Sequence, residues 1–129
     1  MKQGKYPNTF YRVSVKAVIK NDTGDVLAVK EHSDSWELPG GGIDHNETIH
    51  ECLTRELSEE LGIENDFTET FLKIETCYVE FLEIWKMILV YDVKLIGDFS
   101  LNTKGDINDA KFIPVDIYNK NKRDIEPKI

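Results

Sequence analysis

Apolar and polar residues alternate along the first regular segment of the chain. In residues 11–20 every second position is apolar, and the positions between them carry mostly polar or charged side chains. A period of two is typical of a half-buried β-strand, with one face on the core and the other in water. The apolar positions are Val13, Val15, Ala17 and Ile19, and the polar positions include Arg12, Ser14, Lys16 and Lys20.

Further strands are predicted by runs of β-branched and aromatic residues between turn signals. The Asn-Asp-Thr-Gly segment 21–24 predicts a hairpin turn, and the nearly continuous apolar run 26–30 is typical of a central strand. Segments 68–80 and 84–96 predict two long strands, and residues 111–113 predict a short last one. The pattern therefore favours a sheet with few helices.

One long helix is predicted over about residues 49–61. Thr48 and Glu51 have the spacing of a capping box, good helix formers follow, and Gly62 suits the position after a helix end. Two glutamates of this helix, Glu56 and Glu60, fall within or beside its apolar arc, because each residue advances by about 100°. We therefore expect these carboxylates to be partly buried against the sheet.

Three glutamates of this helix lie close together, and their mutual repulsion needs an explanation. Glu56, Glu59 and Glu60 have the spacing i, i+3 and i+4, and like charges in a partly buried place are costly unless they are protonated or bound to a cation. Most Glu-Glu pairs merely decorate an exposed helix, but the helix geometry argues against that reading. Oxygen ligands favour Mg²⁺, for which Mn²⁺ can substitute.

A glycine-rich loop precedes the helix. In Pro39-Gly40-Gly41-Gly42, three glycines leave the backbone free to adopt a positive φ and to approach a ligand closely. The loop and the three glutamates together predict a metal-dependent site.

The segment from Gly41 to Ile63 resembles the Nudix box at all nine specified positions. Five residues separate Gly41 from Glu47, seven separate Glu47 from Arg55, and Arg55 opens the run Arg-Glu-Leu-Ser-Glu-Glu-Leu-Gly-Ile. Agreement at this many positions is a specific signal. The resemblance implies an α/β/α sandwich around a mixed β-sheet, with the box folded as loop, helix and loop.

The resemblance also implies an activity and its metal site. Nudix hydrolases cleave a phosphoanhydride bond of a nucleoside diphosphate derivative with the help of Mg²⁺. By this resemblance Glu56 and Glu60 hold the metal together with the Gly40 carbonyl, and Glu59 is either a ligand or the base that deprotonates water. Which carboxylate acts as the base varies across the family.

Two further box residues are expected to support the site. By the same resemblance Arg55 and Glu47 pair with each other and orient the loop and the helix. Family members often recruit another acidic residue from a distant loop. The candidates, which lie at predicted strand ends, are Glu80, Glu83, Asp106 and Asp109.

The ends of the chain carry weaker signals. Residues 114–118 predict the start of a short terminal helix, and the charged tail after Asn119 is expected to fray. The Lys-rich start lacks the apolar segment of a signal peptide, and no apolar run approaches the roughly 20 residues of a membrane span. We therefore expect a cytoplasmic protein without membrane contact.

Composition narrows the function further. The 129 residues are enough for one domain over 1–129, and the formal charge of −8 disfavours a nucleic-acid partner. Cys52 and Cys77 lack a metal-binding spacing and are expected to be free thiols. The expected partner is a small nucleotide, bound by a monomer or a homodimer.

Three functional hypotheses remain after these observations. The first is hydrolysis of a nucleoside triphosphate or a related diphosphate-linked nucleotide, which includes removal of damaged nucleotides from the pool. The second is removal of pyrophosphate from the 5′ end of RNA, which needs a basic track leading away from the metal. The third is a binding module that senses nucleotide without turnover.

Overall fold

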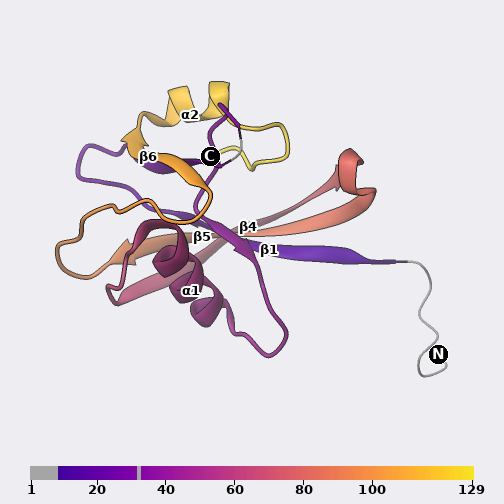
Figure 1. Ribbon diagram of the computed structural model, residues 1–129, viewed down its shortest axis with the longest axis horizontal. Coiled ribbons are helices and arrows are strands. Elements are labelled where there is room, and N and C mark those ends of the chain that lie inside the picture. Colours follow the sequence, from indigo (N-terminus) through magenta and orange to yellow (C-terminus); the bar gives the residue numbers. More distant parts are fainter. Residues whose placement is uncertain (1–8, 32) are drawn as a thin grey trace.

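Within residues 9–31 and 33–129, the part of the chain that the computed structural model describes, a four-stranded mixed sheet packs with a two-stranded sheet and two α-helices (Figure 1). The Lys-rich start considered above lies outside the described residues. This arrangement confirms the predicted α/β class. The strands are β1 (Tyr11–Val18), β2 (Val26–Glu31), β3 (Gly40–Gly42), β4 (Phe67–Val79), β5 (Ile84–Leu95) and β6 (Ile107–Ile113). The helices are α1 (Ile49–Leu61), the 3-10 helix η1 (Glu80–Leu82) and α2 (Val115–Asn121).

The first strand lies inside the four-stranded sheet and is covered on both faces. The strand order is β3-β1-β5-β4, with β1 parallel to β5 and antiparallel to β3. Ser14 and Lys16 are only 2% and 5% exposed, so the polar, water-facing side predicted for this strand is wrong. The reason is a second core cluster, which includes Val18 and Tyr118 and covers this face.

Lys16 keeps its charge in this buried position because carboxylates surround it. Burial alone would lower the pKa of the Lys16 ammonium group. The carboxylates of Glu126, Glu37 and Glu60 outweigh this effect and raise the pKa above its ordinary value of 10.5. A lysine that sequence patterning assigns to water is therefore a buried cation.

The second strand has the predicted burial but not the predicted neighbours. β2 pairs only with β6 as a named strand, in an antiparallel two-stranded sheet. Its residues Val26 to Val29 are nevertheless buried, because Leu27 and Val29 belong to one core cluster while Val26 and Ala28 belong to the other. Core clusters on both faces, rather than neighbouring strands, explain the continuous apolar run.

The two long strands and the last strand follow the predicted order. β4 and β5 form a long antiparallel hairpin that extends to the right in Figure 1, which confirms the strands predicted at 68–80 and 84–96. β6 begins at Ile107 and is longer than the predicted segment 111–113.

Helix α1 begins and ends where the sequence predicts. The Thr48 hydroxyl accepts a hydrogen bond from the Glu51 N–H at 3.1 Å, and the Glu51 carboxylate accepts one from the Thr48 N–H at 3.0 Å. Gly62 ends the helix with φ +66°. The apolar face packs into the first core cluster through Cys52, Leu53, Leu57 and Leu61.

The C-terminal segment after α2 is packed against the core, so the predicted frayed tail is wrong. Tyr118 of α2 is fully buried and its hydroxyl donates a hydrogen bond to the Pro127 carbonyl at 2.9 Å. Glu126 is 4% exposed, and Ile129 packs against the second core cluster. The charged residues of this segment predicted solvent exposure, but the segment covers the face of the sheet that lies opposite α1.

No helix among residues 9–31 and 33–129 has the length and apolar character needed to cross a membrane.

We expect Leu57→Ala to destabilise the fold strongly, because Leu57 is 1% exposed in the cluster under α1. Removing a buried leucine side chain costs about 2 to 5 kcal/mol of unfolding free energy. Urea denaturation measures the loss, and the exposed Thr54→Ala on the same helix is the control, with a change within about 0.5 kcal/mol. A small loss at Leu57 would contradict the packing of α1 on the sheet.

Candidate active site

The glycine loop is built into the edge of the four-stranded sheet. Gly40, Gly41 and Gly42 form β3 and pair antiparallel with β1, with Gly40 opposite Lys16. Gly40 has φ +134°, and a Cβ there would overlap the Val15 carbonyl. Only glycine fits this position, which fixes the backbone of the loop against β1.

The side of the loop that faces α1 meets two glutamates. The Gly40 N–H donates a hydrogen bond to Glu60 Oε1 at 3.0 Å. A Cβ on Gly41 would lie only 2.6 Å from Glu56 Oε1. The missing side chain at Gly41 therefore lets the backbone lie directly against the Glu56 carboxylate, as the sequence predicts for a loop that approaches its neighbours closely.

Arg55 ties the loop to the helix, as the resemblance implied. Its Nε and Nη2 donate hydrogen bonds to the two oxygens of Glu47 at 2.6 and 2.9 Å, and Nη2 also donates to the Gly42 carbonyl at 3.0 Å. Its Nη1 donates to Glu56 Oε1 at 2.9 Å. The hydrogen bonds from Arg55 lower the pKa of Glu47 to about 2, so this pair is charged at neutral pH and orients both the loop and Glu56.

Glu60 is a box carboxylate whose ionisation is disfavoured by burial. Burial raises its pKa from 4.5 to about 9, although Lys16 acts in the opposite direction, and a hydrogen bond with Glu56 adds to the rise. The cause is the one expected from the helix pattern, since two carboxylates share a site shielded from water. A bound cation would remove the cost of ionising both.

Glu59 lines a pocket between the box and the start of β6. Its side chain is 60% exposed and lies 3.4 Å from Arg55 Nη1. The pocket has a volume of about 340 Å³. Its lining combines the three glutamates with Gly40, Gly41, Glu31, Lys104, Gly105, Asp106 and Ile107.

Of the four distal acidic candidates, only Asp106 lines this pocket. Glu80 borders a different cavity near the tip of the β4–β5 hairpin, and Glu83 ends η1 at that tip. Asp109 lies within β6 opposite Lys30. Glu31 also lines the pocket but was not identified from the sequence, because it is the last residue of the apolar strand β2 and belongs to no recognised motif.

The described side chains do not form a complete set of metal ligands. Among residues 9–31 and 33–129, no group of three or more His, Cys, Asp or Glu side chains is arranged to hold one metal ion. Arg55 engages Glu56, and Glu59 extends outward. The residue types nevertheless fit a hard divalent cation, because Glu56, Glu60 and Gly40 line the pocket and could offer it carboxylate and carbonyl oxygens.

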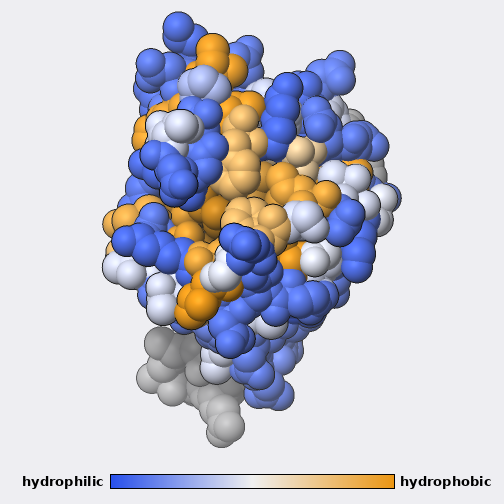
Figure 2. All heavy atoms as spheres, turned by 90° about the vertical axis from the view of Figure 1, so that its left-hand side faces the viewer, coloured by the Kyte–Doolittle hydropathy of each residue, from blue (hydrophilic) through white to orange (hydrophobic). Residues whose placement is uncertain are grey.

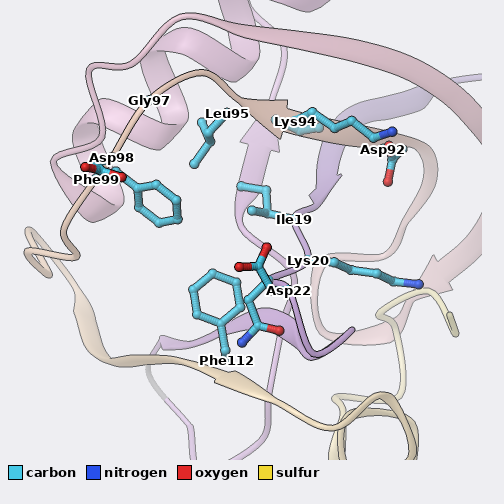
Figure 3. Close-up of a pocket in the computed structure, with 12 residues that line it drawn as sticks. Ile19, Lys20, Asp22, Asp92, Lys94, Leu95, Gly97, Asp98, Phe99 and Phe112 are labelled. Atoms are coloured by element: carbon cyan, nitrogen blue, oxygen red, sulfur yellow. The ribbon is translucent and has the colours of Figure 1, made fainter.

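A larger cavity, of about 750 Å³, lies away from these residues (Figure 3). It is bounded by residues 19–22 after β1, the end of β5 and Phe112 of β6, and its apolar lining includes Ile19, Leu95 and Phe99. Figure 2 shows apolar side chains gathered on this side of the molecule. It contains none of the box glutamates, so size alone does not indicate the site.

Comparison with known proteins places this geometry in a family. The family model of the NUDIX domain matches residues 10–129. An RNA pyrophosphohydrolase of Pseudomonas putida is 43% identical over 60 residues, which are 46% of this chain and 38% of that relative. The matched segment is thus well under half of the relative's length.

Solved structures agree on the fold. The MutT protein from Methanosarcina mazei Go1 superimposes with a TM-score of 0.73 at 21% identity, covering 95% of this chain and 88% of that one. The E. coli dihydroneopterin triphosphate pyrophosphohydrolase has a TM-score of 0.73 at 16% identity, covering 89% and 90%. The fold and the box define an α/β domain of the Nudix type. The chain belongs to the Nudix family.

We expect Gly41→Ala to weaken divalent-metal binding while the fold is retained. The added Cβ displaces the Glu56 carboxylate, whose flexible side chain can move at little cost to stability. A disturbed metal environment typically lowers affinity by about tenfold or more, which titration with Mn²⁺ measures. Gly42→Ala is the matched control, because its Cβ meets the Arg12 guanidinium instead. Equal loss in both variants would contradict a specific role for Glu56.

We also expect the stability of the metal-free protein to fall as the pH rises from about 5 to about 9. Glu60 holds its proton in the folded chain up to a pKa of about 9, whereas an ordinary glutamate loses it near 4.5. Unfolding therefore releases a proton in this interval, and the free energy of unfolding decreases by at most about 1.4 kcal/mol per pH unit.

Urea denaturation at several pH values in the presence of EDTA measures this slope. Glu60→Gln, which cannot ionise, is the control and should show a flatter dependence. Parallel curves for the parent and the variant would contradict the raised pKa of Glu60.

Proposed function

We propose that the chain is a Mg²⁺-dependent pyrophosphohydrolase that attacks a phosphoanhydride bond with water. The observation that carries the proposal is the meeting of the glycine loop with Glu56 and Glu60, in a pocket that Glu59 also lines. Mg²⁺ would be held by Glu56, Glu60 and the Gly40 carbonyl, and Mn²⁺ should replace it. When bound, the cation supplies charge neutralisation and lowers the pKa of water.

The protein groups have separate parts in the proposed reaction. Glu59 reaches the open side of the pocket, so we assign it the role of base toward the attacking water. Arg55 and Glu47 hold the loop and Glu56 in position through their paired hydrogen bonds. Asp106 is the distal carboxylate that we propose as a further support of the cation.

The leading substrate class is a nucleoside triphosphate or another diphosphate-linked nucleotide. A pocket of about 340 Å³ would receive the phosphates, and the acidic balance of the chain favours a ligand that arrives with its own cation. Hydrolysis of damaged nucleotides is one biological use of this chemistry. We expect the protein to act in the cytoplasm as a monomer or homodimer.

The 5′ end of RNA is a second candidate substrate, and two observations favour it. The matched relatives from Pseudomonas putida and Stutzerimonas stutzeri are RNA pyrophosphohydrolases. Arg12, Lys86 and Arg123, which are scattered in the sequence, line one pocket of about 250 Å³ beside Gly42. These cations come from β1, β5 and the C-terminal segment, and they would meet the phosphates of a short RNA end.

The test is release of phosphate or pyrophosphate with Mg²⁺ from a panel of substrates. The panel contains nucleoside triphosphates, oxidised nucleotides, dinucleoside polyphosphates, nucleotide sugars and 5′-triphosphorylated RNA. We expect turnover of one class. Tight binding without turnover of any of them would instead favour the nucleotide-sensing module.

We expect Glu60→Gln to lower kcat by at least about 100-fold with the best substrate, because the substitution removes one charge from the metal site without changing side-chain size. Circular dichroism checks that the variant is folded. Glu69→Gln, on β4 outside the pocket, is the matched control and should keep parental kcat. Parental activity of Glu60→Gln with a normal Mg²⁺ dependence would refute the site assignment.

A further inference from the structure

Leu38 is the residue at which the chain passes from one sheet to the other. The backbone of Glu37 pairs with Val29 of β2 in both directions, at 2.8 and 2.9 Å. The next pairing belongs to the other sheet, where the Pro39 carbonyl accepts a hydrogen bond from the Ala17 N–H of β1 at 2.9 Å. Leu38 lies between the two ladders, immediately before the glycine loop.

Side chains, rather than a neighbouring strand, satisfy the backbone of Leu38. Its N–H donates a hydrogen bond to Glu126 Oε1 at 2.9 Å, and its carbonyl accepts one from Lys16 Nζ at 3.0 Å. Lys16 and Glu126 also form an ion pair at 3.3 Å, with side-chain exposures of 7% and 1%. One buried pair of opposite charges thus holds both backbone groups of the crossing residue.

A buried ion pair of this kind is poor evidence for stability. Desolvation of two charges offsets much of their attraction, and apolar replacements of buried pairs are often neutral or stabilising. The residues that form this pair also come from distant parts of the chain, β1 and the segment after α2. Its distinctive property is geometric, because it fixes the backbone just before Gly40.

The same pair lies behind the candidate metal site. Lys16 is the β1 residue opposite Gly40, and the Gly40 N–H is held from the other side by Glu60. Gly40 therefore lies two residues after Leu38, whose backbone Lys16 and Glu126 hold. A shift at Leu38 would move Pro39 and the Gly40 carbonyl.

We propose that the Lys16–Glu126 pair positions the Gly40 carbonyl for the metal, which makes the C-terminal segment a part of the active site. The inference rests on the proposed metal-dependent function. Lys16 and Glu126 are positioning residues, since they act on the metal site through the backbone of Leu38.

The test compares the parent with a neutral double variant that combines Lys16→Met and Glu126→Gln. The double variant keeps the net charge and leaves an amide oxygen for the Leu38 N–H. We expect it to fold and to bind Mn²⁺ about tenfold more weakly. Without metal, the Leu38 and Gly40 amides should exchange hydrogen about tenfold faster, while the Val15 and Val29 amides keep parental rates, because the opening is local.

The matched control is a second double variant that combines Lys20→Met and Glu69→Gln. It makes the same chemical changes outside the loop. It should retain parental Mn²⁺ affinity and amide exchange. Should the double variant not fold, the combination of Lys16→Gln and Glu126→Gln is the second neutral pair, and we expect it to weaken Mn²⁺ binding about threefold, a smaller effect than typical for metal-site supports.

Two outcomes overturn the inference. Parental Mn²⁺ affinity in a folded variant would show that the pair does not position the carbonyl, and equally faster exchange of all four amides would show a merely structural role. Absence of Mn²⁺ binding by the parent chain would instead refute the metal site itself, and with it the proposed function. Amide exchange separates the two failures because it needs no metal.

Discussion

The close approach of the glycine loop to the carboxylates of α1 is the constraint on which the site depends. Gly40 leaves no space for a Cβ beside Val15, and Gly41 leaves none beside Glu56. Arg55 then joins the loop to the helix by hydrogen bonds to Glu47 and to the Gly42 carbonyl. The loop therefore meets α1 through charged side chains and bare backbone, while the apolar face of α1 packs into the core cluster.

This arrangement places buried ionisable side chains on both sides of the loop. Burial raises the pKa of Glu60 on the helix side to about 9, while Lys16 and Glu126 form a buried pair on the other side. Ionised carboxylates beside the loop are costly alone and become favourable with a cation. The cost of ionising the buried carboxylates and the proposed binding of a cation therefore have the same origin.

Local signals were sufficient wherever neighbours in sequence decide the structure. The capping box of Thr48 and Glu51, the end of α1 at Gly62 and the pairing of Glu47 with Arg55 all involve residues within about two turns or one short loop of each other. The two long strands followed from composition for a similar reason. Binary patterning failed for Lys16, because a second core cluster covers the face it would have left in water.

The sequence by itself determined the box, its helix and the candidate glutamates, since their spacing is read along one continuous segment. Only the tertiary structure decided which distal acid, Asp106, lines the pocket and that Glu126 is buried beside Lys16. It also gathered cations from three segments beside Gly42. These contacts join residues far apart in the chain, and long-range packing leaves no local periodicity from which to predict them.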